Sequence, residues 1–146
     1  AVTLGTLDGA NVEIDALVGR DNDVIFGHTV EELNALRYNY NAFDYYRNDE
    51  RIRDVMDTFI NGFWTGDVED FRGIYDELIS KNDEFFVLSD FDSYVKAQEE
   101  IERRYNDRHE WAKMCLVNIA KSGYFSSDRT IDDYAKEIWG LTPFKF

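Results

Sequence analysis

The sequence predicts an α/β fold that is mostly helical, with two short strands near the N-terminus followed by a helical tail. Two short apolar runs rich in β-branched residues lie between residues 2 and 26. From residue 50 onward, apolar residues recur at helical spacing. The single proline, Pro143, lies near the end of the chain, so few breaks are forced on regular elements.

The first 36 residues read as strand, helix, strand, helix. Val2–Leu4 is an apolar run typical of a strand buried on both faces in a parallel sheet. A turn at Gly5–Ala10 leads to a helix from about Asn11 or Val12 to Val18, and a second strand covers Asp23–Phe26. This order is that of a βαβ unit.

A capping motif begins the next helix. Thr29 and Glu32 form a T-x-x-E capping box, so we expect the helix to run to about Leu36.

From residue 37 the sequence predicts helices joined by short links. Apolar residues at helical spacing predict five helices. Two follow a capping residue: Val68, Phe71, Tyr75, Leu78 and Ile79 after Asp67, and Phe91, Tyr94, Val95 and Ile101 after Ser89 or Asp90. Three end at a glycine: Ile52, Val55, Met56, Phe59 and Ile60 before Gly62; Trp111, Met114, Cys115 and Ile119 before Gly123; and Ile131, Tyr134, Ala135, Ile138 and Trp139 before Gly140. The run Phe85–Leu88 is expected to be an apolar linker or a short strand.

Two strands do not make a stable parallel sheet alone. We therefore expect residues 1–36 to be the end of a larger sheet and residues 37–146 to be a helical C-terminal region, one incomplete domain overall. The amphipathic helix over Ile131–Trp139 needs a groove in which to bury its apolar face. Exposed apolar surface and self-association are the expected consequences.

Composition limits the possible partners and location. The chain has 146 residues, 44% hydrophobic and 16% aromatic, enough for an ordered globule. A net charge of -14 argues against nucleic acid and anionic membranes as partners. No apolar run reaches the roughly 18 residues of a membrane span, and no signal-peptide pattern occurs. The single cysteine, Cys115, excludes an internal disulfide and favours a reducing, cytoplasmic location.

The segment Gly5-Thr6-Leu7-Asp8-Gly9-Ala10-Asn11 is a glycine-containing turn between a strand and a helix. Such a turn can hold an anion at the helix N-terminus, so a small phosphate- or nucleotide-binding domain is one hypothesis. The turn is not G-x-G-x-x-G, has no P-loop lysine and carries Asp8. We expect instead that Asp8 or Asn11 caps the helix and that the glycines permit a tight turn.

The remaining candidate residues favour structural roles. His28 and His109 lack ligand-like spacing, so no metal site is predicted, and Cys115 is expected to be an inert buried thiol. Adjacent carboxylates such as Asp132–Asp133 and Glu99–Glu100 indicate solvated helix faces. An aromatic cluster could form a sugar platform, but packing in a core or domain interface is the favoured interpretation. Its members are Tyr38, Tyr40, Phe43, Tyr45 and Tyr46.

Four stretches, in order, carry a family resemblance. They are "TLGTLDGANVEI", "YNAFDYY", "FDSYVKAQEEIERRYND" with "EWAKM", and "NIAKSGYFSSDRTIDDYAKEIWG". Together they resemble the C-terminal segment of the α-glucan (glycogen, starch and maltodextrin) phosphorylases. The resemblance implies a Rossmann-like half of a glycosyltransferase-B-type fold. It also implies an enzyme that transfers a terminal α-1,4-linked glucosyl unit to inorganic phosphate, giving glucose 1-phosphate.

The same resemblance implies pyridoxal phosphate as the cofactor of the full enzyme, with its phosphate group acting as the proton-transfer partner of the substrate phosphate. The family's cofactor lysine lies in a Gly-Thr-Gly-Asn-Met-Lys stretch that this sequence does not contain. The lysines here occur in the helical tail: Lys81, Lys96, Lys113, Lys121, Lys136 and Lys145. We therefore expect no catalytic, cofactor-binding or metal-binding residue in this chain.

A supporting role near the cofactor pocket is the one site role that the resemblance suggests. Its candidates are Gly5, Thr6, Asp8, Gly9 and Asn11. The segment alone is predicted to be an inactive scaffold whose partner is the rest of the phosphorylase chain, with glucan and phosphate as substrates of the full enzyme. An autonomous acidic helical interaction module is the alternative.

Overall fold

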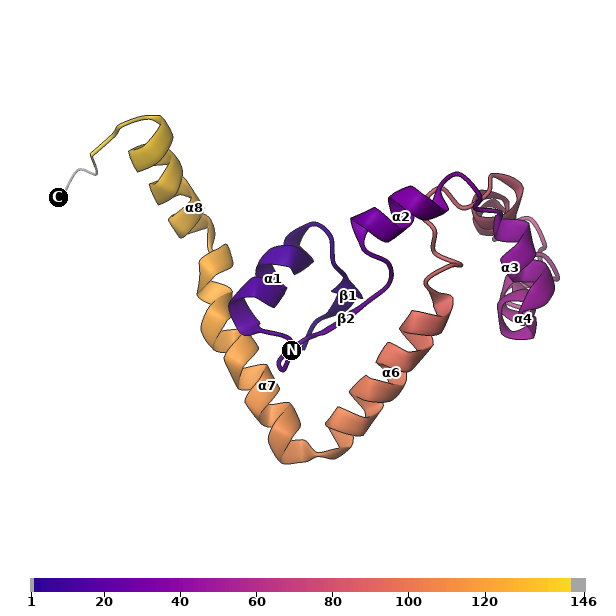
Figure 1. The fold of residues 1–146 in the computed structure, drawn as a ribbon, viewed down its shortest axis with the longest axis horizontal. Helices are drawn as coiled ribbons and strands as arrows, with labels where there is room; N and C mark the ends of the chain where they lie inside the picture. The colour runs from indigo at the N-terminus through magenta and orange to yellow at the C-terminus, as the bar shows by residue number, and fades with distance from the viewer. Residues whose placement is uncertain (1, 143–146) are drawn as a thin grey trace.

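The computed structural model describes residues 2–142 and contains two short strands and a series of helices (Figure 1). Strand β1 (Leu4–Thr6) and strand β2 (Val24–Phe26) pair in parallel, with Leu4 opposite Val24 and Thr6 opposite Phe26. Helix α1 (Ala10–Val18) forms the crossover between the strands. The βαβ unit predicted for the start of the chain is therefore confirmed.

Strand β1 differs from its prediction in two respects. It begins at Leu4, not at Val2, because its position is set by pairing with Val24–Phe26. All three residues of β1 are only partly buried, so burial on both faces was wrong for the residues that the structure describes.

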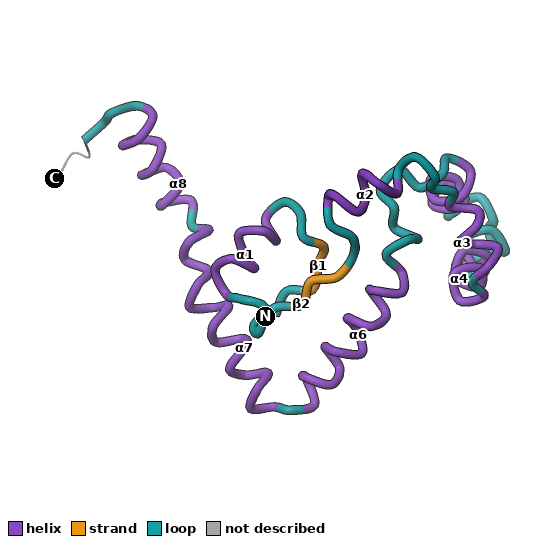
Figure 2. Tube along the Cα trace, viewed as in Figure 1, coloured by secondary structure: helices purple, strands orange, loops and turns teal. Residues whose placement is uncertain are grey.

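The remaining elements are helical (Figure 2). Their bounds are α2 Val30–Leu36, α3 Ala42–Asn48, α4 Glu50–Thr58, α5 Arg72–Tyr75, the π-helix η1 Asp76–Ser80, α6 Phe91–Asn106, α7 Arg108–Lys121, the 3-10 helix η2 Ser122–Phe125, α8 Ser127–Asp133 and the π-helix η3 Tyr134–Ile138. The predicted order of two short strands followed by a mostly helical tail is thus confirmed. Among residues 2–142, no helix has the length and apolar character needed to cross a membrane.

The capping box predicted for the start of α2 is confirmed. The Thr29 hydroxyl accepts from Glu32 N at 3.3 Å, and the Glu32 carboxylate accepts from Thr29 N at 2.7 Å. These two bonds are the predicted capping box, and they satisfy N–H groups that the first turn of α2 leaves open.

The helix predicted after an Asp67 cap begins later than expected. Asp67 Oδ1 accepts from Glu69 N at 2.9 Å and closes a turn, and the helix starts only at Arg72. The run Phe85–Leu88 forms turns, not a strand. In this run Phe86 adopts φ 60°, a left-handed conformation that interrupts an extended segment.

The elements form two packed regions and one projecting arm (Figure 1). Helices α6 and α7 diverge as a V, with α6 against β2 and α7 against α1. Helices α3, α4 and η1 enclose the main core at one end of the molecule. Its buried members are Tyr40, Ala42, Ile52, Met56, Phe86 and Leu88. Helix α8 extends α7 away from both regions.

Candidate functional site

A groove of about 650 Å³ opens at the carboxyl ends of the two strands. In parallel α/β sheets this edge is where ligands bind. Segments far apart in the chain form its walls: Thr6, Leu7 and Asp8 after β1; Phe26 and His28 after β2; Val30, Leu33 and Arg37 of α2 and its end; Glu84, Phe85, Phe86 and Val87 of the following turn; and Asp90, Phe91 and Tyr94 at the start of α6. The groove is mostly apolar, with charged groups along its length.

One wall is fixed by contacts between the β2–α2 loop and the start of α6. His28 Nδ1 lies 2.5 Å from Asp90 Oδ1, and the same oxygen accepts from His28 N at 3.0 Å. Gly27 N donates to Ser93 Oγ at 3.0 Å. A Cβ on Gly27 would lie 2.7 Å from Asp90 Oδ2, so the loop approaches α6 as closely as a glycine allows.

These contacts correct the expected role of Asp90. It stands at the N-cap position of α6 but makes no side-chain capping bond. Its carboxylate instead bonds to His28, which is 62 residues away in the sequence. The sequence interpretation missed this pair because nothing local to either residue indicates it.

The Gly5–Asn11 turn forms the start of the other wall. Gly9 occupies the N-cap position of α1 without a side-chain capping bond, so the predicted cap by Asp8 or Asn11 is wrong. Asn11 Nδ2 and Asp8 N both donate to the Thr6 carbonyl at 2.9 Å. The side chain of Asn11 therefore ties the turn to the end of β1.

The two positions of this turn favour glycine for different reasons. Gly9 has φ 48°, a conformation that L side chains rarely adopt. A Cβ on Gly5 would lie 2.3 Å from Asn11 Nδ2, so Gly5 leaves room for the Asn11 amide. The prediction that the glycines permit a tight turn is confirmed. At Gly9 the reason is the backbone conformation, and at Gly5 it is the close approach of the Asn11 side chain.

The charges of the groove do not suit a phosphate-bearing cofactor on their own. Its carboxylates are Asp8, Glu84 and Asp90, and its basic residues are His28 and Arg37. Arg37 lies over the Phe86 ring, 5.6 Å from the ring centroid. Among residues 2–142 no lysine lines the groove, so these residues do not supply the amine that would bind pyridoxal phosphate covalently.

The lysines of the described chain lie elsewhere. Lys81, which follows η1, pairs with Glu77 four positions earlier, and Lys136 of η3 pairs with Asp132 of α8. Lys113 lies 3.7 Å from Glu110 on α7. Lys145 falls outside the described residues. The predicted position of the lysines in the helical tail is confirmed for those that the structure describes.

The structure also places the other candidates. His109 is exposed in the first turn of α7. Cys115, on the same helix, is half-buried, so the expectation of a buried thiol was wrong. Over residues 2–142, no group of three or more His, Cys, Asp or Glu side chains is arranged to hold a metal ion. Asp132 and Asp133 pair with residues on their own helical segment, as expected of a solvated face.

The aromatic cluster is divided between core and surface. Tyr40 is buried, and Tyr45 and Tyr46 pack against the main core, which confirms the packing interpretation for these residues. The Tyr40 hydroxyl donates to Asp83 Oδ2 at 2.6 Å, and burial together with this bond raises the pKa of Tyr40. Tyr38 is 89% exposed and Phe43 47%, so these two lie outside the core.

Tyr46 makes a similar bond on the surface of the core. Its hydroxyl donates to Asp57 Oδ1 at 2.7 Å. That bond, reinforced by burial, raises the pKa of Tyr46 to about 12, so the phenol stays protonated at neutral pH.

Together, the parallel βαβ unit and the groove at its carboxyl edge define an α/β segment that is mostly helical. Residues 1–141 match the family model for carbohydrate phosphorylases, and the chain belongs to that family.

The curated relatives give a closer comparison. The chain is 50% identical over 145 residues to a glycogen phosphorylase of Bacillus subtilis, covering 98% of this chain and 18% of that protein. It is 45% identical to a glycogen phosphorylase of Pasteurella multocida, over 99% of this chain and 18% of the relative. The muscle form of human glycogen phosphorylase is 41% identical over 98% of this chain and 17% of the relative. The chain thus spans less than a fifth of the length of these relatives.

Proposed function

We propose that this chain is the C-terminal segment of a glycogen phosphorylase. The full enzyme would transfer a terminal α-1,4-linked glucosyl unit to inorganic phosphate, giving glucose 1-phosphate, with pyridoxal phosphate as cofactor. The observation that carries the proposal is the 50% identity to a glycogen phosphorylase over 98% of this chain. In that enzyme the segment would close a Rossmann-like half of a glycosyltransferase-B-type fold, with residues 1–36 ending its sheet and residues 37–146 forming a helical C-terminal region.

Within such an enzyme, the segment would act as scaffold. The absence of lysine from the groove lining supports this role, because the cofactor amine would come from another part of the chain. The Gly5–Asn11 turn would support the cofactor pocket by holding residues of its lining in place. Its bonds to the Thr6 carbonyl hold the end of β1 in one position, and Thr6 and Asp8 line the groove.

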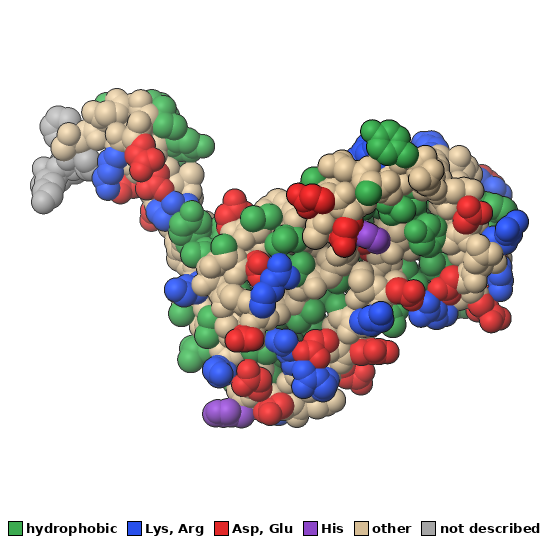
Figure 3. All heavy atoms as spheres, viewed as in Figure 1, with side chains coloured by type: hydrophobic (Ala, Val, Ile, Leu, Met, Phe, Trp, Pro, Cys, Tyr) green, Lys and Arg blue, Asp and Glu red, His purple; other side chains and the backbone are tan. Residues whose placement is uncertain are grey.

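The principal partner would be the rest of the phosphorylase chain. The α8–η3 arm, residues 127–139, exposes its apolar side chains to solvent. Ile131 is 57% exposed, Ile138 65% and Trp139 58%. Figure 3 shows hydrophobic side chains gathered along this arm. A surface of this kind favours burial against another segment, and in its absence it favours self-association. The single cysteine supports a cytoplasmic location.

A second candidate is an autonomous acidic helical interaction module. The observation that favours it is the main core, which α3, α4 and η1 close without help from the sheet. A module of this kind would melt cooperatively as a monomer. A segment that depends on missing partners would self-associate through its apolar arm.

A segment exchange tests the proposal. The matching segment of the Bacillus subtilis relative is replaced by this chain, and glucose 1-phosphate release from maltopentaose and phosphate is measured with pyridoxal phosphate present. We expect the chimera to retain activity within about tenfold of the parent, since the exchanged segment supplies no reacting group. The isolated chain, assayed alongside, should release no product.

Two outcomes would contradict the proposal. A soluble, folded chimera without phosphorolysis would mean that this segment does not fit a glycogen phosphorylase. Product from the isolated chain would mean that its residues perform the chemistry, contrary to a scaffold role.

A further inference from the structure

The turn that follows α4 carries the pair Asn61-Gly62. Among the asparagines of the sequence, Asn61 alone precedes a glycine. Its side chain is exposed, in the turn between α4 and α5. Because glycine has no side chain, nothing at position 62 shields its backbone nitrogen from the Asn61 side-chain amide. The pair therefore places a nitrogen nucleophile next to an exposed amide carbonyl.

A hydrogen bond folds the Asn61 side chain back over the following peptide. Phe63 N donates to Asn61 Oδ1 at 2.9 Å, the bond of an Asx turn. A donor at this distance polarises the side-chain carbonyl and stabilises negative charge that develops on its oxygen. Gly62 N donates to no backbone carbonyl within residues 2–142, so no backbone bond has to break before this nitrogen reacts.

The rest of the turn keeps this arrangement in the folded chain. Gly66 N donates to the Gly62 carbonyl at 2.8 Å and closes the turn. Gly62 adopts φ 78°, a conformation that favours glycine. Trp64 Nε1 donates to Thr58 Oγ1 at 3.1 Å, which ties the turn to the end of α4. These contacts hold the nucleophile and the amide in one geometry, as an efficient intramolecular reaction requires.

We propose that Asn61 is a site of spontaneous deamidation through a cyclic imide. Solvent hydroxide removes the proton of Gly62 N, and this nitrogen attacks Asn61 Cγ to form a new C–N bond. The bond from Cγ to Nδ2 breaks, and the leaving nitrogen takes a proton from water to depart as ammonia, which restores the hydroxide. Water then adds to either imide carbonyl, giving aspartate or isoaspartate. The net reaction consumes one water and releases one ammonia, with no oxidation or reduction.

The two products differ in what they do to the turn. Aspartate at position 61 keeps a side-chain oxygen that can accept from Phe63 N. Isoaspartate inserts an additional methylene into the backbone before Gly62, so the Gly62 carbonyl is displaced from Gly66 N and the turn opens. Each product also adds one negative charge to a chain of net charge -14.

Asn82 provides an internal comparison, because it is also exposed but its amide is bonded at both ends. Its Oδ1 accepts from Ala42 N at 2.8 Å, and its Nδ2 donates to the Tyr40 carbonyl at 3.1 Å. The following nitrogen, Asp83 N, donates to the Glu77 carbonyl at 3.2 Å. Both reacting groups of this pair are therefore occupied in the folded chain.

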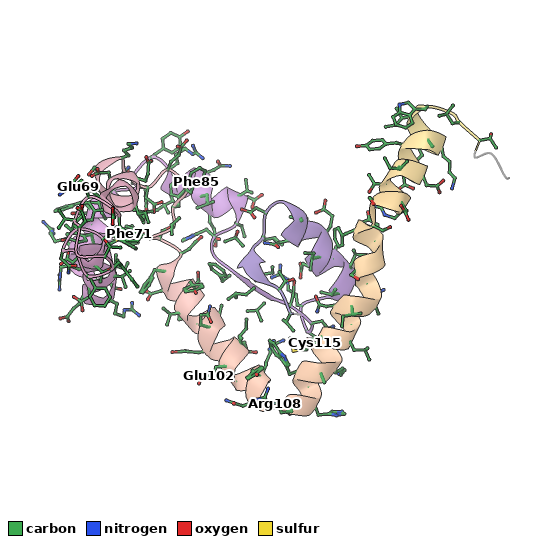
Figure 4. The ribbon with its side chains drawn as sticks, turned by 180° about the vertical axis from the view of Figure 1, so that it is seen from behind. Glu69, Phe71, Phe85, Glu102, Arg108 and Cys115 are labelled. Atoms are coloured by element: carbon green, nitrogen blue, oxygen red, sulfur yellow. The ribbon has the colours of Figure 1, made fainter. Side chains whose placement is uncertain are left out.

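The Asn61 turn is separate from the groove at the strand ends. Figure 4 places Glu69 and Phe71 at the end of the molecule opposite α8, and the Phe71 ring lies 6.4 Å from the Trp64 ring. None of residues 61–66 lines the groove. The reaction needs only the turn and water, so it does not depend on the proposed function.

The test incubates the chain at mildly alkaline pH, folded or unfolded in urea, and maps its peptides by mass spectrometry. In the folded chain we expect Asn61 to be converted at least about tenfold faster than Asn82, and faster as the pH rises. Asn82 should be converted measurably only in urea. Asn61→Gln should stay unconverted over the same time, because its longer side chain would have to close a larger ring. Conversion of Asn61 only in urea, or equal conversion of Asn61 and Asn82 in the folded chain, would overturn the inference.

Hydrogen exchange at the Gly66 amide gives a second readout. This amide should exchange slowly in the parent and in Asn61→Asp, and fast in the isoaspartate form purified from the incubated chain, because only that form loses the bond to the Gly62 carbonyl. Equal exchange in Asn61→Asp and the isoaspartate form would overturn the proposed opening of the turn. Neither readout requires phosphorolysis, so failure of the proposed function would leave both results interpretable.

Discussion

The main core and the α8–η3 arm are both rich in apolar residues, yet only one of them buries its apolar residues within the described chain. In the core, Met56 is 2% exposed and Ile52 3%. On the arm, Ile138 is 65% exposed and Trp139 58%. Both segments are amphipathic in sequence, so their spacing alone does not separate them.

Long-range polar contacts distinguish the two regions. Around the core, the Asn82 side chain accepts from Ala42 N at 2.8 Å and donates to the Tyr40 carbonyl at 3.1 Å. On the arm, the side-chain bonds of α8 and η3 stay within a few residues, such as Lys136 to Asp132. Because most helical stability in proteins comes from tertiary packing, the core is expected to hold its structure alone and the arm to need a partner.

The largest effect should come from emptying the core. Met56→Ala should lower the free energy of unfolding by about 2 to 5 kcal/mol, because it leaves a cavity among buried side chains. Urea denaturation followed by circular dichroism measures the change. Ile138→Ala on the arm should change it by less than about 0.5 kcal/mol. Equal losses for both variants would mean that the arm is packed as tightly as the core in solution.

Removing the buried Asp83 carboxylate should lower the free energy of unfolding by a smaller amount. Asp83 Oδ2 accepts from the Tyr40 hydroxyl at 2.6 Å and from Leu88 N at 2.8 Å. Asp83→Ala leaves both buried donors unsatisfied and should cost about 2 kcal/mol of stability, measured by the same denaturation.

Asp70→Ala is the control for Asp83→Ala, because Asp70 is exposed, and it should be close to neutral. If Asp83→Ala were as stable as the parent, the buried bonds would contribute nothing to the core.

The smallest predicted effect depends on pH. Asp23 is 1% exposed, and neither carboxylate oxygen has a hydrogen-bond partner in the described chain. Burial, with the nearby Asp15 carboxylate, raises the pKa of Asp23 above its ordinary value of 3.8. The fold therefore favours the neutral acid, and stability is lost as the pH rises from the unfolded pKa through the higher folded one.

Asp23→Asn removes this penalty. We expect the variant to be about 1 kcal/mol more stable than the parent at pH 7, with the difference shrinking toward pH 3. Thermal unfolding of both proteins across this range measures the difference. A parent that is more stable than the variant at pH 7 would mean that the Asp23 carboxylate has favourable partners in solution.

The sequence predicted features whose causes are local. The Thr29–Glu32 capping box depends on residues three positions apart, and the α4 apolar face depends on a repeat of one or two turns. The start of α5 was missed because Asp67 closes a turn around Glu69 where a cap was expected. In both a turn and a helix cap, an Asp carboxylate accepts a hydrogen bond from a nearby backbone N–H. The sequence alone therefore does not distinguish the two.

The groove could be predicted only in part. Its position at the carboxyl ends of the strands follows from the βαβ order. Its wall at His28 and Asp90 does not, because that contact joins residues 62 positions apart. The buried carboxylates of Asp23 and Asp83 were also missed. For Asp83 the reason is the same, because its bond to the Tyr40 hydroxyl joins residues 43 positions apart.

Hydrogen exchange at individual amides tests the central claim most directly, by comparing the isolated chain with the chimeric phosphorylase. We expect slow exchange around Ile52 and Met56 in both proteins. We expect fast exchange over Tyr134–Ile138 in the isolated chain and strong protection of the same amides in the chimera. Equal protection of the arm in both proteins would mean that the arm needs no partner from the rest of the chimera.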